Sequence, residues 1–481
     1  MPLLLQQIPF GIDPEKVFTH CYKDQPYAFW LDGNRIIPGL SRYSFMGANP
    51  RFLVSTRKGK TEIVYPTHTD LTDRNPFDVV RQILDDYPLP PSLHQSIPFV
   101  AGLVGYFGYE MNQYVEAVPV RSFDPTEAPE AFWMFVDQVL IYDQVEKKAY
   151  LSRLVADSSE LDSARAECEK RLRQISEASA LSIPEPDLAP VDLPSYQHWF
   201  EQRETYASYI SKIKEIQEHI ARGDIYQACF THQITASLGQ DPFELYRVLR
   251  RINPAPFSGY VRMKDLHIVS SSPERFLKCS AGGIVESRPI KGTRPRSASA
   301  DEDQQLRREL QTSEKDRAEN LMIVDLVRND LGRVCETGHV RVPALMRVES
   351  YATVHQLVSI VEGELRSGQR PLDAVKAAFP GGSMTGAPKI RAMEILHGLE
   401  PVARGIYSGG LGYLDLRGGL DLSMVIRTLI CRGGKAYFHV GGGIVADSDP
   451  EKEYQETMDK AFALKQAIVR AHLQASSVPR T

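Results

Sequence analysis

Glycines placed inside apolar, strand-like runs constrain the fold of this chain most strongly. The clearest case is residues 98–109, where Gly102, Gly105 and Gly108 interrupt an otherwise largely apolar stretch. Glycine within a strand pattern usually marks a place where other backbone approaches closely. Helical periodicity also occurs, notably over residues 206–220, with Gly223 following as a helix-ending residue. This mixture predicts an α+β or α/β protein with a large sheet-based core.

The chain divides at residues 177–194, which we interpret as a linker because residues 177–190 contain three prolines and no sustained periodicity. The linker separates an N-terminal region, 1–176, from a second region, 195–475. Further predicted helices cover 157–176 and 304–331, and another begins at the cap and acidic first turn of 448–451. The remaining strand-like runs are 225–236, 407–414, 422–431 and 436–440.

Composition excludes several classes of protein. The formal net charge is −5, so no overall field favours nucleic acid. No apolar run approaches the roughly 20 residues needed to span a bilayer, and the N-terminus lacks the pattern of a signal peptide. The six cysteines lie far apart without a CxxC pair, which excludes a zinc ribbon and favours reduced thiols. We therefore expect a cytoplasmic enzyme with neither nucleic acid nor membrane as partner.

Two glycine-rich segments imitate nucleotide-binding motifs but lack essential parts. Residues 441–446 match G-x-G-x-x-A, yet a single helix is predicted after them and no second parallel strand. Residues 381–389 resemble a phosphate loop, but Ala387 and Pro388 separate the last glycine from Lys389. A glycine-rich turn that leads into a helix can still present N–H groups to a carboxylate.

Carboxylates occur at a spacing that suits a metal ion. Glu453 and Glu456 stand at positions i and i+3 of the last predicted helix, Lys460 follows on the same side, and Glu319 lies on another helix. Carboxylates from two helices can hold Mg²⁺ and leave coordination sites for an anionic substrate. Acidic residues at this spacing more often form a solvated helix face, and spacing alone does not decide between the two.

Six ordered motifs resemble those of the chorismate-utilising enzymes. The resemblance is dense over residues 195–475 and looser over 1–175. It implies an α/β fold with two facing β-sheets flanked by helices, in one large domain with the active site between the sheets. The motifs are Ser-Pro-Glu-Arg-Phe at 272–276, Ser-Arg-Pro-Ile-Lys-Gly-Thr-Arg-Pro-Arg at 287–296, and the segments 315–326, 379–389, 441–448 and 453–457.

A few positions distinguish the branches of that family. At position 291 the chain resembles aminodeoxychorismate synthases, which carry Lys there, whereas anthranilate synthases carry Ala. Gln227 replaces the water-activating Lys of isochorismate and salicylate synthases, and Gln356 replaces a His that the anthranilate branch ties to pyruvate loss. The Leu-Leu-Glu-Ser motif of a tryptophan feedback pocket is also missing, and residues 30–33, Trp-Leu-Asp-Gly, stand at the corresponding place. All four differences point to the large subunit (component I) of the aminodeoxychorismate branch.

The resemblance also implies which residues hold a substrate with two carboxylates. Mg²⁺ held by Glu319, Glu456 and Glu453 would bind the ring carboxylate. Lys460 and backbone N–H groups around Gly292 and Thr293 would also contact this carboxylate. The groups implied for the enolpyruvyl carboxylate are Tyr407, Arg427 and the amides of Gly441, Gly442 and Gly443.

Two side chains are implied as catalytic. Glu274 would be the general acid on the 4-hydroxyl, and needs a pKa above its reference value of about 4.3; alternatively it pairs with Arg275. Lys291 would add to ring C2, which requires a lowered pKa. Burial, the magnesium ion and the nearby Arg294 and Arg296 would lower it. The alternative is that Lys291 only contacts a substrate carboxylate electrostatically.

The implied reaction is amination of chorismate by ammonia to 4-amino-4-deoxychorismate, a precursor of 4-aminobenzoate and folate. Ammonia would come from a separate glutamine amidotransferase subunit in a heterodimer, because no cysteine here lies in a nucleophile-elbow context. Two alternatives are an anthranilate synthase component I and a catalytically silent homologue that serves as a binding scaffold. The silent homologue would require a broken metal or acid position.

Overall fold

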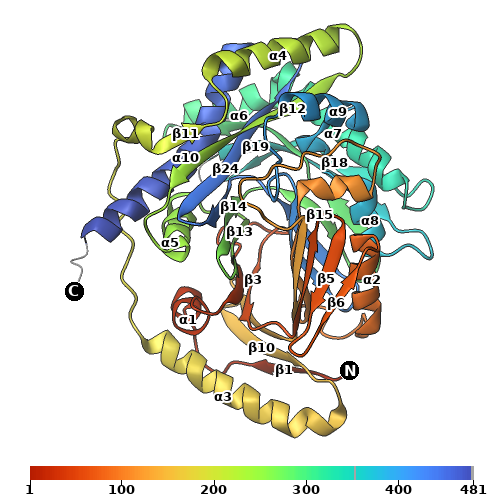
Figure 1. Cartoon of the computed structure of the whole chain (residues 1–481), viewed down its shortest axis with the longest axis vertical. Coiled ribbons are helices and arrows are strands. Elements are labelled where there is room, and N and C mark those ends of the chain that lie inside the picture. The colour runs from red at the N-terminus through yellow and green to blue at the C-terminus, as the bar shows by residue number, and fades with distance from the viewer. Residues whose placement is uncertain (352–353, 478–481) are drawn as a thin grey trace.

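The computed structural model describes residues 1–351 and 354–477, and the strands of these ranges form two twelve-stranded sheets with antiparallel neighbours (Figure 1). The first sheet has the order β1 (Leu3–Gln7), β10 (Lys148–Leu154), β9 (Gln138–Asp143), β3 (Tyr43–Ala48), β2 (Tyr27–Leu31), β13 (Phe257–Met263), β14 (Leu266–Ser272), β23 (Thr428–Arg432), β24 (Lys435–Ile444), β12 (Gln227–Ser237) and β11 (Phe200–Gln202), with β20 (Gly386–Ala387) beside β12.

The second sheet has the order β17 (Ile290–Pro295), β19 (Val354–Glu364), β16 (Ile284–Ser287), β15 (Arg275–Cys279), β22 (Leu420–Met424), β21 (Gly410–Asp415), β7 (Gly102–Phe107), β8 (Ala131–Val136), β4 (Phe52–Arg57), β5 (Lys60–Val64) and β6 (Thr69–Thr72), with β18 (Arg341–Ser350) beside β19. The helices are α1 (Pro14–Cys21), α2 (Pro76–Asp86), α3 (Leu161–Ala180), α4 (Tyr206–Ala221), α5 (Pro242–Ile252), α6 (Ala300–Thr312), α7 (Glu314–Gly332), α8 (Pro371–Ala378), α9 (Lys389–Leu399) and α10 (Pro450–Ser477). Short 3-10 turns are η1 (Tyr109–Tyr114), η2 (Ser158–Glu160), η3 (Leu193–Trp199) and η4 (Gly382–Met384).

The first sheet is buried on both faces, as alternate residues of β2 demonstrate. Phe29 belongs to the core between the sheets, whereas Ala28 and Trp30 belong to a second core on the opposite face. Helices α1, α3, α5 and α10 contribute to that second core, and α7 packs against β19 of the second sheet. Successive side chains of a strand point to opposite faces, so β2 is apolar throughout. The predicted α/β fold with two facing sheets flanked by helices is confirmed.

The glycines of β7 lie where neighbouring backbone leaves no room for a side chain. A Cβ atom on Gly102 would lie 2.1 Å from the carbonyl oxygen of Leu414, and one on Gly105 would lie 1.9 Å from that of Phe132. Leu414 belongs to β21 and Phe132 to β8, the two strands that flank β7. The close approach predicted from the glycine pattern is confirmed.

The segment interpreted as a linker begins inside a helix. Helix α3 continues to Ala180, no helix or strand covers residues 181–192, and η3 then begins at Leu193. An ion pair of 2.8 Å between Arg251 and Glu185 holds this segment against α5. Strands from before and after it pair directly, β2 with β13 and β7 with β21. Both regions therefore contribute to the same two sheets.

Two predicted elements are wrong because each is interrupted. The helix predicted over 304–331 is two helices, since Ser313 leaves the helical conformation and its hydroxyl accepts a hydrogen bond from the N–H of Asp316, 3.3 Å away, as the cap of α7. The strand predicted over 422–431 is β22 and β23. Between them Arg427 has a φ of 52°, a left-handed conformation that breaks the ladder.

Other predicted boundaries agree more closely. Helix α4 begins at Tyr206 and is followed by Gly223 with a φ of 81°. Helix α10 begins at Pro450, and the side chain of Asp449 accepts a hydrogen bond of 3.0 Å from the N–H of Glu451. The helix predicted over 157–176 is displaced and runs from Leu161 to Ala180. Local capping signals thus located the starts of α4 and α10, whereas the sequence did not show the breaks at Ser313 and Arg427.

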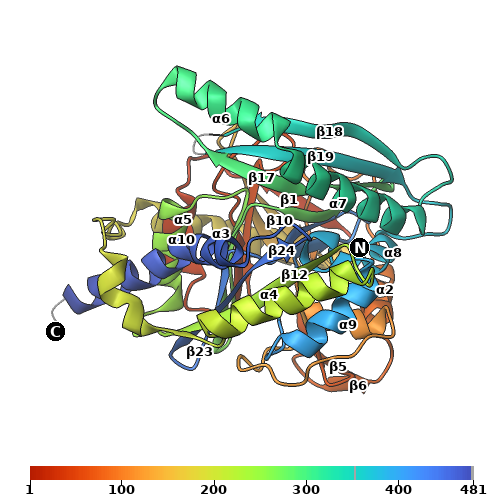
Figure 2. The ribbon, with the colours of Figure 1, turned by 90° about the horizontal axis from the view of Figure 1, so that it is seen from above.

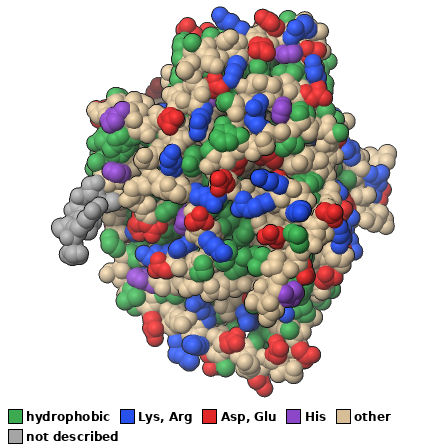
Figure 3. All heavy atoms as spheres, viewed as in Figure 1, with side chains coloured by type: hydrophobic (Ala, Val, Ile, Leu, Met, Phe, Trp, Pro, Cys, Tyr) green, Lys and Arg blue, Asp and Glu red, His purple; other side chains and the backbone are tan. Residues whose placement is uncertain are grey.

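The surface mixes both signs of charge, and Figure 3 shows acidic, basic and apolar side chains interspersed over one face. None of the helices in the described part of the chain combines the length and the apolar composition needed to cross a membrane. All six cysteines are unpaired, in agreement with the expectation against a disulfide scaffold.

Candidate active site

A cavity of 720 Å³ lies between the two sheets. Its walls come from β17, β19 and α7 on one side and from β24 and α10 on the other, which Figure 2 shows facing each other. The structure brings every predicted site residue to this one cavity. These are Glu274, Lys291, Gly292, Thr293, Glu319, Tyr407, Arg427, Gly441, Gly442, Gly443, Glu453, Glu456 and Lys460.

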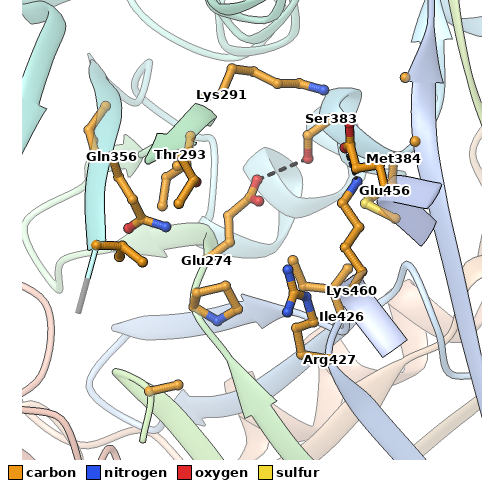
Figure 4. A pocket seen from close by; sticks show the side chains of 18 of the residues that line it. Glu274, Lys291, Thr293, Gln356, Ser383, Met384, Ile426, Arg427, Glu456 and Lys460 are labelled. Atoms are coloured by element: carbon orange, nitrogen blue, oxygen red, sulfur yellow. Dashed lines mark hydrogen bonds and ion pairs between the residues drawn. The ribbon is translucent and has the colours of Figure 1, made fainter. Parts of the chain in front are cut away.

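Glu274 is buried in the connection between β14 and β15. Its backbone carbonyl accepts a hydrogen bond of 3.0 Å from the N–H of Met424, and its side chain points into the cavity (Figure 4). Burial raises the pKa of Glu274 to about 7, against the opposing effects of Ser383, Lys291 and Lys460. Arg275 does not pair with it, because that guanidinium binds Asp421 and Glu286 instead. Glu274 can therefore hold a proton near neutral pH.

Lys291 stands out of the sheet at an irregularity in β17. The pairing of β17 with β19 shifts register between Ile290 and Thr293, and a bulge of this kind redirects side chains. Gly292, inside the bulge, has a φ of 79°, and a Cβ atom there would lie 2.7 Å from Cγ of Asp316. Only glycine fits this position, which places the ammonium group of Lys291 at the cavity.

The expectation of a lowered pKa at Lys291 is wrong for the protein alone. Burial lowers the pKa, but the carboxylate of Glu319, 3.7 Å from Nζ, and further anionic neighbours raise it above its usual value. The two arginines expected to repel a proton are neutralised by partners. Arg294 pairs with Asp316 at 3.0 Å and Arg296 pairs with Asp303 at 2.7 Å. Sequence proximity did not reveal these pairs.

Three glutamates reach the cavity from α7 and α10, the two helices that we call its helical wall. Glu453 is buried on α10 and accepts a hydrogen bond of 2.8 Å from Ser448, Glu456 is half-exposed one turn later, and Glu319 projects from α7. Lys315 bridges two of them, with its Nζ 3.3 Å from Glu453 and 3.9 Å from Glu319. The arrangement thus already accommodates one positive charge between two carboxylates.

This wall fits a hard cation by its donor chemistry, because carboxylate oxygens are the ligands that Mg²⁺ prefers. In residues 1–351 and 354–477 no three His, Cys, Asp or Glu side chains are grouped closely enough to hold an ion together as they stand. Lysine ammonium groups lie among these oxygens: Lys315 between Glu319 and Glu453, and Lys460 at 2.7 Å from Glu456. A metal ion here would therefore replace Lys315 and Lys460 in neutralising the negative charge of the glutamates.

Arg427 provides a cationic group without an ion-pair partner among the described residues. Arg427 has a left-handed conformation between β22 and β23, and its guanidinium points into the cavity (Figure 4). Burial lowers the pKa of Arg427, although Tyr407 and Glu456 act to raise it. The ring of Tyr407 stacks on His439 with centroids 5.0 Å apart. A half-buried guanidinium in this state can bind a carboxylate with two parallel hydrogen bonds.

The three glycines of β24 bring backbone to the same place. Strand β24 pairs with β12 as far as Ile444, whereas β23 pairs with it only as far as Tyr437. Backbone groups on that edge of Gly441–Gly443 therefore face the cavity rather than another strand. A Cβ atom at Gly443 would lie 2.4 Å from Nε2 of Gln227 and 3.3 Å from Nζ of Lys291. Glycine at this position keeps the two side chains close to the strand.

The sequence matches the model of a protein family described as chorismate binding enzyme over residues 21–466. The chain belongs to this family. The assignment predicted from the six motifs is confirmed. Aminodeoxychorismate synthase of Streptomyces pristinaespiralis is 40% identical over 97% of this chain, which spans 65% of that relative's length. The chain therefore corresponds to about two thirds of that protein.

Other relatives of this chorismate binding enzyme carry two different names. Aminodeoxychorismate synthase component 1 of Klebsiella aerogenes is 38% identical, covering 94% of this chain and 96% of its own. Anthranilate synthase component 1 of Synechocystis is also 38% identical, covering 95% and 93%. The crystal structure of anthranilate synthase component I from Streptococcus pneumoniae aligns with a TM-score of 0.75 at 31% identity, over 90% of this chain and 93% of its own.

Of the other positions that distinguish branches of the family, Gln356 and Gln227 lie at or next to the cavity of Lys291, whereas residues 30–33 do not line it. Gln356, on β19, pairs across the sheet with Thr293, and Figure 4 shows both at the cavity. Gln227 is fully buried, and neither polar atom of its amide has a hydrogen-bond partner in the described structure. Residues 30–33 lie elsewhere, and Leu31 and Gly33 line a second cavity of 390 Å³.

Sequence reasoning assigned no role to Ser383 and Lys315, although both lie in the recognised motifs. Ser383 donates a hydrogen bond of 2.9 Å to Glu274, and Lys315 contacts two of the glutamates. Neither periodicity nor charge marks them in the sequence. The contacts of Ser383 with Glu274 and of Lys315 with Glu453 join segments more than one hundred residues apart, which only the tertiary structure reveals, whereas Lys315 and Glu319 are one turn apart on α7.

Proposed function

We propose that this chain replaces the 4-hydroxyl of chorismate by an amino group to give 4-amino-4-deoxychorismate, the precursor of 4-aminobenzoate in folate synthesis. The observation that carries the proposal is that a side-chain amine, Lys291, and a carboxyl that can hold a proton, Glu274, line one cavity. The same cavity contains the guanidinium of Arg427, which has no ion-pair partner among the described residues. Relatives named aminodeoxychorismate synthase support it. We expect the protein to work in the cytoplasm, where its six thiols stay reduced.

Chorismate has two carboxylates, and the cavity offers two groups to receive them. Arg427, Tyr407 and the amides of Gly441–Gly443 would hold the enolpyruvyl carboxylate. The ring carboxylate would lie near Lys460 and the backbone of Gly292 and Thr293. Fixing both ends of the substrate orients C2 and C4 toward the reacting side chains, which removes much of the entropic cost of reaction.

Mg²⁺ is the proposed cofactor, with Glu319, Glu453 and Glu456 as the residues that would hold it. When bound, it supplies Lewis acidity that stabilises charge on the ring carboxylate. The protein's own part is to present carboxylate oxygens from α7 and α10 together, and Ser448 fixes one of them by its hydrogen bond to Glu453.

The proposed chemistry is a double displacement. The neutral amine of Lys291 forms a bond to C2, both ring double bonds shift, and the C4–oxygen bond breaks as Glu274 donates its proton and water leaves. Ammonia then bonds to C4, both double bonds return, and the bond from C2 to Lys291 breaks with release of the neutral amine, while the extra proton of the incoming ammonia returns to Glu274. Lys291 must lose a proton before it attacks, since Glu319 stabilises its charged form. If it stays charged, Lys291 serves as an electrostatic contact to the substrate.

A glutamine amidotransferase subunit is the proposed source of ammonia. The six cysteines carry no sign of a glutaminase nucleophile, because five are buried and none of the pKa shifts found among them lowers the pKa of a thiol. A second candidate function is that of anthranilate synthase component 1, favoured by the 38% identity to the Synechocystis protein. Lys291, Gln227 and Gln356 favour the first proposal.

Product identification tests the proposal. The purified chain is incubated with chorismate, Mg²⁺ and an ammonium salt, and the products are identified by mass and by release of pyruvate. We expect 4-amino-4-deoxychorismate without pyruvate, no turnover with glutamine, and glutamine use once the partner subunit is added. Anthranilate with pyruvate would establish the second candidate, and unchanged chorismate would support a silent binding scaffold.

A further inference from the structure

We propose that the glycine-rich segment 379–389 serves to place Ser383 against Glu274, and that Ser383 is a positioning residue which fixes the orientation of that carboxyl group. This inference rests on the proposed role of Glu274 as the proton donor. It gives the segment a function, which its resemblance to a phosphate loop did not supply.

The hydrogen bond between the two side chains distinguishes the two oxygens of Glu274. The hydroxyl of Ser383 donates to Oε1 over 2.9 Å, and Figure 4 shows this contact at the cavity. Across the described residues, Oε2 has no hydrogen-bond partner in the protein. One oxygen is thus held by the protein and the other is left for the substrate's hydroxyl. A carboxyl with one fixed oxygen cannot rotate freely, so its proton stays aimed at the cavity.

Two glycines allow the turn to reach Glu274. A Cβ atom at Gly381 would lie 2.2 Å from Cε of Met424, and one at Gly382 would lie 2.5 Å from Cδ2 of Leu326. The turn is therefore packed closely between β22 and α7, and a Cβ atom at either glycine would require Met424 or Leu326 to shift. Arg404 anchors the next residue by donating a hydrogen bond of 2.6 Å to the carbonyl of Met384.

The charged environment of Glu274 gives the contact a measurable effect. Lys291 from β17 and Lys460 from α10 lie near enough to lower the pKa of Glu274, and Arg427 lines the same cavity from the β22–β23 connection. Ser383 lowers it further, because a donated hydrogen bond stabilises the carboxylate. Burial outweighs all of these. Removing the hydroxyl should therefore raise the pKa of Glu274 above its present value of about 7.

The test compares Ser383→Ala and Ser383→Thr with Ser423→Ala as a matched control. Ser423 is also a buried serine, and its hydroxyl donates a hydrogen bond of 3.0 Å to the carbonyl of Leu411 outside the cavity. The protonation of Glu274 is followed directly by ¹³C NMR of labelled glutamate carboxyls, with the signal assigned through Glu274→Gln. This readout does not depend on catalysis, and rates of amination are measured in parallel.

We expect Ser383→Ala to raise the pKa of Glu274 by about one pH unit and to lower kcat about tenfold with little change in KM. Ser383→Thr should restore both, and Ser423→Ala should change neither. An unchanged Glu274 titration in Ser383→Ala, with kcat also unchanged, would overturn the inference. A shifted titration in a chain that aminates no chorismate would support the contact and reject the proposed function instead.

Discussion

The cavity has a strand wall, which includes the connection between β14 and β15, and the helical wall of α7 and α10. Both walls carry glutamate, but in opposite electrostatic settings. Glu274, between β14 and β15, is buried away from acidic side chains, and its pKa rises to about 7. Glu456, on α10, lies 2.7 Å from Lys460, and its pKa falls below the usual value although burial opposes this. Glu274 thus keeps its proton and Glu456 keeps its negative charge, although burial raises the pKa of Glu319 on the same helical wall. The comparison teaches that local surroundings, not residue type, separate a proton donor from a cation ligand.

Removing charge from the helical wall should have the largest effect. Glu456→Gln and Glu319→Gln should each lower turnover by about three orders of magnitude or more, because the wall would no longer hold Mg²⁺. Calorimetric titration should show lost Mg²⁺ binding, while thermal unfolding stays near that of the parent, since both side chains face a polar cavity. Glu451→Gln, an exposed glutamate on the same helix, is the control. Full activity of Glu456→Gln would refute the assignment.

Removing the proton donor from the strand wall should reduce turnover by about 10²- to 10⁴-fold, the usual contribution of a general acid. In Glu274→Gln the shape is kept and the proton is lost, so kcat should fall while Mg²⁺ and chorismate still bind. The measurement is steady-state kinetics together with calorimetry. Lost Mg²⁺ binding in this variant would mean that the two walls do not act separately.

Lys291→Ala should leave slow residual amination, about a hundredfold below the parent, because binding and the proton donor survive. Ammonia or water would then enter directly, with C2 products expected beside the normal one. Product analysis by mass distinguishes these routes. A rate equal to that of the parent would reduce Lys291 to an electrostatic contact.

The smallest expected effect is on the pH dependence. The parent combines two opposite requirements, a protonated Glu274 and a neutral Lys291, so the proton on Glu274 is isolated in Lys291→Ala, where no lysine has to lose a proton. A carboxyl with a raised pKa keeps its proton below that pKa and loses it above. In Lys291→Ala, kcat at saturating free ammonia should therefore fall as the pH rises through the pKa of Glu274, at or above about 7 because Lys291 no longer lowers it. Free ammonia itself becomes more abundant at higher pH, and rates are therefore compared at equal ammonia concentration. The falling limb should be missing when Glu274→Gln is added to that variant. A limb that persists in the double variant would assign it to another group.

Much of the fold and the composition of the site followed from local sequence. Glycines within an apolar run predicted the close backbone contacts of β7, and the cap before Pro450 predicted the start of α10, because both patterns are visible in residues adjacent in the sequence. The ordered motifs identified the cavity residues, which lie on strands, helices and their connections where the chain is locally constrained.

The remaining features depend on distant partners. Helical periodicity continues past Ser313, so the break before α7 was not visible. The ion pairs that neutralise Arg294 and Arg296, and the contact of Ser383 with Glu274, join residues that are separated along the chain. The predicted direction of the pKa shift at Lys291 was wrong for the protein alone for the same reason, since Glu319 approaches it from helix α7.

The covalent role of Lys291, assisted by the proton on Glu274, is the central claim, and intact-protein mass spectrometry tests it most directly. The chain is mixed with chorismate and Mg²⁺ in the absence of ammonia and then trapped. We predict an added mass of chorismate minus water that maps to Lys291 and is absent from Glu274→Gln and Lys291→Ala. No adduct under trapping conditions, together with an undiminished rate in Lys291→Ala, would contradict the account.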